Sequence, residues 1–444
     1  MAPWRLLALV TLGASLCLPV SAQSRFSVLY GFSGQGGDGA APNGILAIGK
    51  DGVLYGTTAS GGSGPCALQE VPSGCGTVFA LQPPTVSGGA WTERMLYRFA
   101  GANGDGWSPY GGVVIGSSGR LYGTTLYGGT GCGTYGCGTV FELTPPKAAG
   151  EGWTETVLYR FTGENGDGAA PVGGLARFQN GDLYGLTAFG GLSGYGTIYR
   201  LAPPAVAGEA WNLTILHSFA VPSFSDPQGY PADMGLTIGE DGALYGATPL
   251  GGLTGDGMVF RVVPPRAPGG ILEETELYSF IYPHGDGDFP GPEGGVTAGA
   301  RGVLYGSTYT GGDTALCAGD ISCGTVFELK PPAIVGGTWQ ETVICNLGSP
   351  SCGVYTLFPD TNVVVDRNGV LYGAGLYDLF RLQPPAVSGG AWSFSTIYNF
   401  NGGSAGVEPS GLAMRADGIL FGTTMQGGLC NYCGAVFSWA PPGR

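Results

Sequence analysis

One triplet, Leu-Tyr-Gly, recurs along the chain and restricts its fold more than any other feature. Its aromatic residue lies at Tyr55, Tyr122, Tyr184, Tyr245, Tyr305, Tyr372 and, as phenylalanine, Phe421. Subtracting successive positions gives spacings of 49 to 67 residues. Seven copies of a unit of about 60 residues account for nearly the whole chain, so the sequence predicts a repeat protein.

Each unit carries four strand signals in the same order. A glycine-rich first segment leads through a pair such as Asn180-Gly181 into the Leu-Tyr-Gly segment. Asn-Gly and Asp-Gly pairs tolerate the positive φ of a tight hairpin turn. The third segment, Gly-Thr-Val-Phe at 76–79 and its copies, ends at a Pro-Pro pair, because proline cannot donate to a strand ladder. The fourth segment begins near a tryptophan, as at 91–99.

Seven units of four short antiparallel strands describe an all-β fold, the seven-bladed β-propeller. The chain starts with a fourth-type segment at 25–32 and finishes with a third-type segment at 435–439. We therefore expect the N-terminal strand to complete the last blade and close the ring. Residues 23–444 would then form a single seven-bladed propeller domain, although length alone suggests several domains.

Composition indicates a large buried core and disfavours several partners. Gly 87 and Pro 32 are high counts, but hydrophobic residues make up 43% of the chain and charged residues only 11%, which argues against disorder. The net charge of −14 disfavours nucleic acid and anionic membrane surfaces as partners. After residue 22 no apolar segment approaches the roughly 18 residues of a membrane-spanning helix, so we expect no membrane span.

Residues 1–22 have the pattern of a secretory signal peptide. Arg5 precedes a short apolar stretch, and Val20, Ser21 and Ala22 are small residues of the kind found at a cleavage site. We expect a secreted or periplasmic protein after cleavage.

The ten cysteines after residue 22 fall into local pairs, which in an exported chain predicts disulfides. The pairs are Cys66/Cys75, Cys132/Cys137, Cys317/Cys323, Cys345/Cys352 and Cys430/Cys433. Cys430 and Cys433 also form a C-x-x-C motif. This motif lies between glycines and a strand and not at a helix N-terminus, so a structural disulfide is favoured over a redox or zinc site.

The repeat itself resembles a known family. Leu-Tyr-Gly-Thr-Thr-x-x-Gly-Gly followed by Gly-Thr-Val-Phe-x-Leu-x-Pro-Pro is similar to the GloVer tandem repeat of bacterial exported proteins with a choice of C-terminal anchor. The resemblance covers residues 25–444 and implies export and a repeat-built propeller, but no activity and no catalytic residues. Only Gly443 and Arg444 follow the last Pro-Pro pair, so we expect release without such an anchor.

Ligand contacts are expected on one face of the propeller. We number the four strand segments of a blade 1 to 4 in chain order. The loops that join segments 2 and 3 (2–3 loops) and the crossovers from one blade to the next emerge together on what we call the loop face. The turns between segments 1 and 2 (1–2 turns) and the connections between segments 3 and 4 (3–4 connections) emerge on the opposite face, the turn face. The loop face has the longer and more varied loops, where function concentrates. Aromatic residues present in every blade, such as the Leu-Tyr-Gly tyrosines, are interpreted as packing between blades. The unrepeated aromatics of the loop face are the predicted contacts: Trp107, Tyr110, Tyr127, Tyr135 and Tyr432, together with Tyr230, Phe289 and Tyr309.

The sixth unit departs from the repeat. Its Leu-Tyr-Gly segment at 371–373 runs almost directly into the strand that starts at Leu379, with the Gly-Gly loop deleted. This deletion predicts a notch on the loop face lined by Tyr355, Phe358 and Tyr377. Neutral drift in one repeat is the alternative.

The acidic loops and the histidines give little indication of metal binding or catalysis. Gly-Asp-Gly loops at Asp38, Asp105, Asp167 and Asp286 are interpreted as turns that cap the crossovers, because each supplies a single carboxylate and calcium needs six to eight oxygens. Calcium binding is the alternative, and Asp286 and Asp288, the one pair of nearby carboxylates, mark the loop where it would occur; both are included among the predicted ligand contacts. His217 stands at a repeated tyrosine position and is interpreted as a structural replacement. No catalytic residue, metal or cofactor is predicted.

The sequence therefore favours a monomeric, non-catalytic binding module for an extracellular glycan or protein. A polysaccharide hydrolase or lyase with carboxylates at the central channel is one alternative, and a purely structural envelope protein is another.

Overall fold

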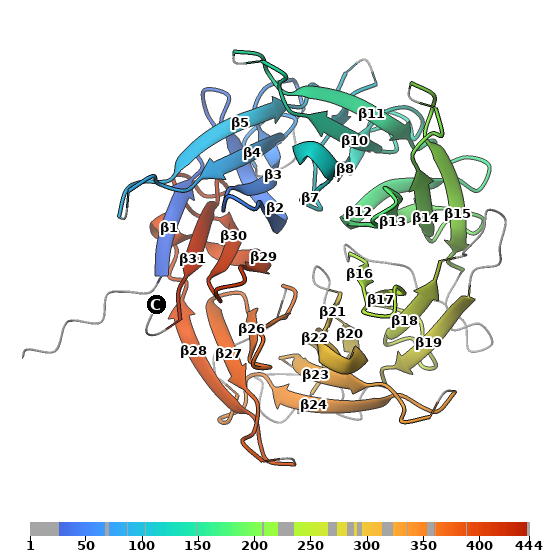
Figure 1. Cartoon of the computed structure of the whole chain (residues 1–444), viewed down its shortest axis with the longest axis vertical. Helices are drawn as coiled ribbons and strands as arrows, with labels where there is room; N and C mark the ends of the chain where they lie inside the picture. The colour runs from blue at the N-terminus through green and yellow to red at the C-terminus, as the bar shows by residue number, and fades with distance from the viewer. Residues whose placement is uncertain are drawn as a thin grey trace, which may run out of the picture.

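Seven small antiparallel sheets stand as blades around a central axis (Figure 1). The computed structural model describes residues 26–441 apart from 67–70, 87, 103, 149, 207, 221–234, 265–272, 282–287, 291–294, 313–322, 335, 353–358, 360 and 388. The predicted all-β, seven-bladed propeller of four-stranded antiparallel blades is confirmed.

The first four blades follow one another along the chain. Blade 1 comprises β2 (Gly39–Ile48), β3 (Leu54–Gly61), β4 (Thr77–Gln82) and β5 (Thr92–Arg98). Blade 2 comprises β7 (Val113–Ile115), β8 (Leu121–Thr125), β10 (Thr139–Thr144) and β11 (Thr154–Arg160), beside the short pair β6 (Gly106–Trp107) and β9 (Tyr127–Gly128). Blade 3 comprises β12 (Gly168–Arg177), β13 (Leu183–Gly190), β14 (Thr197–Ala202) and β15 (Asn212–Ser218). Blade 4 comprises β16 (Thr237–Ile238), β17 (Leu244–Thr248), β18 (Met258–Val263) and β19 (Glu273–Ser279).

The remaining blades complete the ring. In blade 5 the first strand is divided into β20 (Asp288–Pro290) and β21 (Val296–Ala298), followed by β22 (Leu304–Thr310), β23 (Thr325–Lys330) and β24 (Gln340–Asn346). Blade 6 comprises β25 (Val364–Val365), β26 (Leu371–Ala374), β27 (Asp378–Gln383) and β28 (Ser393–Asn399). Blade 7 comprises β29 (Val407–Met414), β30 (Leu420–Gln426), β31 (Ala435–Trp439) and β1 (Phe26–Gly31). Short 3-10 turns occur at η1 (Ser117–Gly119), η2 (Ala300–Gly302) and η4 (Gly403–Ala405).

The two ends of the described chain close the ring. β1 pairs antiparallel with β31, with Phe26 opposite Trp439 and Gly31 opposite Ala435. Figure 1 shows the blue β1 lying along the red β31. The N-terminal strand therefore completes the last blade, as the order of segments predicts.

Close packing explains the glycine of Leu-Tyr-Gly. A Cβ atom on Gly56 would lie 2.6 Å from Cζ of Phe79, and one on Gly123 would lie 2.5 Å from Cζ of Phe141. The third-strand phenylalanines of blades 1, 2, 4, 5 and 7 also meet an aromatic ring of the preceding blade: Phe99 and Phe141, for example, have centroids 5.2 Å apart in an edge-to-face arrangement. The glycine thus makes room for the ring that joins two blades.

Hydroxyl pairs explain the threonines of the repeat. The Oγ1 atoms of Thr58 and Thr77 lie 2.7 Å apart in blade 1, and those of Thr125 and Thr139 lie 2.8 Å apart in blade 2. All four residues are buried. Because a buried hydroxyl needs a partner, one threonine of the Leu-Tyr-Gly strand is matched by a threonine on the third strand in blades 1, 2, 3 and 5.

The repeated tyrosines and tryptophans pack between blades, as interpreted from their repetition. Tyr122 of blade 2 meets Trp211 of blade 3 at a centroid distance of 6.1 Å, and Tyr245 of blade 4 meets Trp339 of blade 5 at 6.4 Å. The rings also meet charged side chains: Arg177 lies over the Tyr122 ring at 5.8 Å, and Arg261 lies over the Tyr245 ring at 6.0 Å.

Four of the predicted disulfides are present: Cys66–Cys75, Cys132–Cys137, Cys345–Cys352 and Cys430–Cys433. Cys323 is also disulfide-bonded, and its predicted partner Cys317 lies outside the described residues. Such bonds fit an oxidising extracellular or periplasmic environment. Across the residues that the structure covers, no helix has the length and apolar character needed to cross a membrane.

Candidate functional site

Three of the predicted contact residues form one group on the loop face of blade 2. The short strands β6 and β9 place Trp107 directly opposite Tyr127, with ring centroids 4.5 Å apart. The ring of Tyr135 lies 5.7 Å from that of Tyr127 and 6.2 Å from that of Trp107. We call Trp107, Tyr127 and Tyr135 the aromatic cluster.

Solvent exposure differs between the members of the aromatic cluster. Trp107 is only 7% exposed, whereas Tyr135 is 61% exposed at the tip of the 2–3 loop. Trp107 donates its indole N–H to the backbone oxygen of Tyr135 at 3.2 Å. The cluster therefore has a fixed base and a ring face that solvent reaches.

A disulfide and backbone bonds hold the loop that carries Tyr135. Cys132 and Cys137 are bonded across this loop. The backbone N–H of Gly128 donates to the oxygen of Tyr135 at 2.7 Å. Because the loop is restrained on both sides, little conformational freedom remains to be lost on binding.

The other predicted contacts do not join this group. Tyr110 lines a cavity on the propeller axis. Tyr377 is 52% exposed in blade 6, and Tyr432 lies in the 2–3 loop of blade 7, where it bridges to Gly427. The backbone of Asp288 pairs with Thr310 in blade 5. Asp286, Tyr355, Phe358 and Tyr230 lie outside the described residues, as do the side chains of Asp288 and Phe289.

The axial cavity measures about 360 Å³ and is lined by the first strands of several blades. Glycine backbones meet closely around it: a Cβ atom on Gly411 would lie 2.7 Å from the oxygen of Gly44. Asn43, Thr237 and Ser410 supply the polar side chains of the wall, beside Tyr110. Among the described residues that form this wall there is no carboxylate, so the wall holds no acid and base pair for hydrolysis.

The acidic loops at Asp38, Asp105 and Asp167 cap the crossovers, as interpreted. Asp105 accepts the backbone N–H groups of Ala100 and Gly106, each at 2.7 Å, and the hydroxyl of Tyr97 at 3.3 Å. Asp167 repeats this pattern with Thr162 and Gly168. Burial raises the pKa of Asp105, and these hydrogen bonds oppose the rise. Within the described residues, no group of three acidic, histidine or cysteine side chains is positioned to hold a metal.

Glutamates of the fourth strands face these capped loops across the blade junctions. Glu93 and Glu155 each have an Oε1 atom that is buried and has no hydrogen-bond partner among the described residues. Burial, followed by repulsion from Asp38, raises the pKa of Glu93 to about 7. Burial and then Asp105 raise the pKa of Glu155 to about 7. These residues were not predicted, and their only sequence signal is their fixed place two residues after a tryptophan.

His217 replaces a repeated tyrosine at another such junction. Its Nδ1 atom lies 2.6 Å from Oε2 of Glu274, and both side chains are largely buried. Its ring packs edge-to-face on Phe219 with centroids 4.7 Å apart. His217 thus joins blades 3 and 4, which agrees with a structural role.

Comparison with known proteins identifies the family. The profile of the Gloeobacter/Verrucomicrobia repeat matches residues 18–232, 65–317 and 207–437. Since these overlapping matches span most of the sequence, the chain belongs to this repeat family. No curated protein matches the chain.

Solved structures share the fold at low identity. Virginiamycin B lyase from Staphylococcus aureus is similar with a TM-score of 0.51 and 14% identity over 94% of this chain and 99% of that chain. An alpha-L-arabinanase from Penicillium chrysogenum gives a TM-score of 0.43 and 11% identity over 93% and 97%. A gluconolactonase from Xanthomonas campestris gives 0.39 and 13% over 94% and 89%. At 14% identity the likeness to the lyase concerns the propeller fold alone.

Proposed function

We propose that the protein is an exported, disulfide-stabilised propeller that binds an extracellular glycan through its loop face. The aromatic cluster of blade 2 carries this proposal. A tyrosine ring that is 61% exposed is backed by two further rings and held by a disulfide loop. Flat, restrained aromatic faces with polar edges suit the amphipathic faces of sugars.

The cluster favours binding over turnover. Its members are aromatic, and the nearest loop carboxylate in this crossover, Asp105, is engaged by backbone N–H groups. Binding by preformed rigid aromatics needs no reacting group. A hydrolase or lyase centred on the channel would need carboxylates, which the described residues of the cavity wall do not supply.

Two further loop-face regions are proposed as secondary contacts. Tyr377, which is 52% exposed, would form one wall of the blade 6 notch with Tyr355 and Phe358. Tyr432 would contribute from blade 7. Substitution of Tyr377 by alanine tests the notch once a ligand is in hand.

The proposal is tested by screening the oxidised mature protein on a glycan array, with and without a calcium chelator. The proposal predicts chelator-insensitive binding of neutral glycans that is lost in Tyr135→Ala. Phe189→Ala is the matched control, because Phe189 is 63% exposed in the corresponding 2–3 hairpin of blade 3. Binding to no glycan would contradict the proposal and favour a protein partner or a structural role, and release of sugar products would favour the hydrolase or lyase.

A further inference from the structure

A groove of about 850 Å³ lies between blades 2 and 3 on the turn face, opposite the aromatic cluster. Its walls include the 1–2 turn that contains Asn180, the side chains of Arg177 and Tyr122, and Trp211 next to the 3–4 connection of blade 3. Aromatic, amide and guanidinium groups therefore converge in one hollow.

Arg177 departs from the repeat at a position where every other blade is apolar. It lies six residues before the leucine of its Leu-Tyr-Gly triplet. The same position in the other blades is occupied by Ile48, Ile115, Ile238, Ala298, Val365 and Met414. The scaffold thus has an uncharged apolar side chain here, and packing does not explain an arginine.

The guanidinium of the partly buried Arg177 has no carboxylate partner among the described residues. Its Cζ atom lies 5.8 Å from the ring centroid of Tyr122, and its Nε atom is buried with no hydrogen-bond partner among the described residues. An unpaired buried donor of this kind is costly, so Arg177 is not placed here to stabilise the fold. Arg177 is partly exposed and lines the groove, so its guanidinium can pair with an anionic oxygen there.

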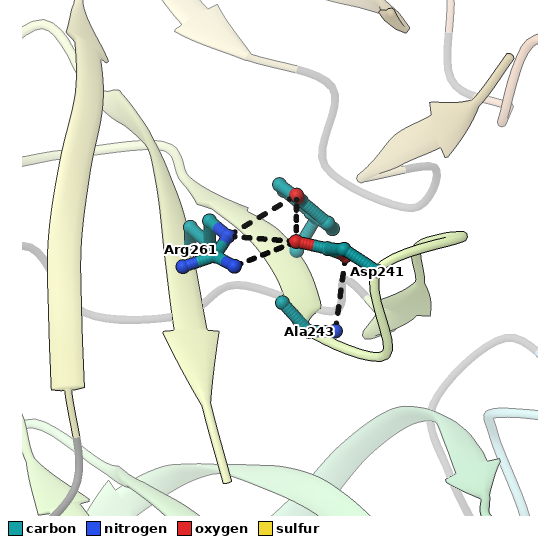
Figure 2. A network of polar contacts seen from close by, with 4 residues as sticks. Asp241, Ala243 and Arg261 are labelled. Carbon is teal, nitrogen blue, oxygen red and sulfur yellow. Dashed lines mark hydrogen bonds and ion pairs between the residues drawn. The ribbon is translucent and has the colours of Figure 1, made fainter. Parts of the chain in front are cut away.

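Two other arginines of the turn face, Arg261 and Arg200, are each paired with a carboxylate. Figure 2 shows Arg261 of blade 4, which binds Asp241 through Nη2 at 2.6 Å and through Nε at 3.1 Å. The hydroxyl of Tyr245 also donates to Asp241. In blade 3, Arg200 pairs with Asp182 at 2.7 Å. Arg177 stands on the same face without such a carboxylate.

The local charge of the groove is opposite in sign to that of the chain. Arg120, Arg160 and Arg177 line it against two glutamates, Glu142 and Glu209. Arg120 is already paired with Glu142 at 2.7 Å. The groove therefore has one positive charge in excess, which suits a single anionic group. The net charge of −14 on the whole chain repels long polyanions.

We propose that this groove binds a short saccharide that carries a carboxylate, such as a uronic acid residue. The guanidinium of Arg177 pairs with the carboxylate, a geometry in which arginine excels. The half-buried indole of Trp211, whose ring lies 6.1 Å from that of Tyr122, offers a face to the sugar ring. The exposed amide of Gln179 is placed to hydrogen-bond hydroxyls.

The inference rests on the glycan-binding function but uses a separate site and a different ligand charge. The experiment titrates the oxidised protein with trigalacturonic acid and, separately, with the neutral trisaccharide of galactose, by calorimetry. We expect the acidic trimer to bind and the neutral trimer to bind at least tenfold more weakly at this groove.

Arg177→Ile tests the site with the residue that blades 1, 2 and 4 carry at this position. It should weaken binding of the acidic trimer at least tenfold while the melting temperature is retained. Arg177→Lys, which keeps the charge but loses the planar fork, should restore only part of the affinity. Tyr135→Ala should leave acidic-trimer binding unchanged, which separates this site from the loop-face cluster.

Three results would overturn the inference. The acidic trimer could fail to bind the wild-type protein, it could bind the Arg177→Ile variant equally well, or the neutral trimer could compete with it at equal affinity. Failure of the loop-face proposal has a different signature, namely neutral-glycan binding that survives Tyr135→Ala.

Discussion

Two glutamates at the blade junctions should make the protein less stable at neutral pH than in mild acid. Burial, followed by the charge of a neighbouring aspartate, raises the pKa of Glu93 and of Glu155 to about 7 from an ordinary value of 4.5. In each residue a buried Oε1 atom has no hydrogen-bond partner among the described residues. The double substitution Glu93→Gln with Glu155→Gln removes both charges and nearly preserves the shape.

The sign of the effect follows from proton binding. Because the pKa is higher in the folded state than in the unfolded chain, folding is disfavoured once the groups ionise in the unfolded chain. The cost is absent below about pH 4.5, grows as the pH rises, and is complete above about pH 7. A difference of about 2.5 pH units corresponds to about 3.4 kcal/mol per group. Solvent screening of these half-buried side chains reduces this to about 1 to 1.5 kcal/mol each.

Thermal unfolding measures the difference. At about 2.1 cal/mol/K of unfolding entropy per residue, a chain of this length shifts by roughly 1 °C per kcal/mol. The double variant should therefore melt about 2–3 °C above the wild type at pH 8 and at the same temperature at pH 4.5. Exposed Glu209→Gln is the control and should change neither value. The reasoning is refuted if the gain of the double variant does not grow between these two pH values.

Two further predictions concern the packing between blades. Gly56→Ala should lower the free energy of unfolding by about 1–3 kcal/mol, because its Cβ would meet the ring of Phe79. Gly152→Ala, whose Cβ would have no neighbour within 4 Å, should not, and equal effects in urea titration would contradict the packing argument. His217→Phe should cost about 2 kcal/mol, because it leaves the partly buried Glu274 without its partner. Adding Glu274→Leu should recover most of this loss, since the neighbouring junction already places Tyr159 near Leu213; a double variant no more stable than the single one would contradict this account.

The blades could be predicted from the sequence because the residues that begin turns and end strands act locally. Asn-Gly turns, Gly-Gly ends and Pro-Pro stops act within a few residues of themselves, and seven copies remove the ambiguity of any single one. Closure of the ring followed from which segment type stands at each end. The reason for the Leu-Tyr-Gly glycine was not visible, because the ring of Phe79 that requires Gly56 lies on another strand.

The candidate sites were only partly predictable. Trp107, Tyr127 and Tyr135 were selected because they are not repeated, but only the pairing of β6 with β9 shows that they form one cluster. The raised pKa of Glu93 and the unpaired Nε atom of Arg177 depend on residues of the neighbouring blades. The sequence of a single repeat does not show which side chains become buried between blades. For the aromatic cluster and for Arg177, the useful sequence signal is a residue that differs from its counterparts in the other copies of the repeat.

The central claim, that the aromatic cluster of blade 2 binds a glycan, is tested most directly by calorimetric titration of one neutral oligosaccharide from the array. Wild type, Tyr135→Ala and Phe189→Ala would be compared under oxidising conditions. The account predicts that Kd rises about tenfold or more in Tyr135→Ala, as for a central aromatic contact, and stays unchanged in Phe189→Ala. Equal Kd values for all three proteins, or a larger loss in Phe189→Ala, would contradict it.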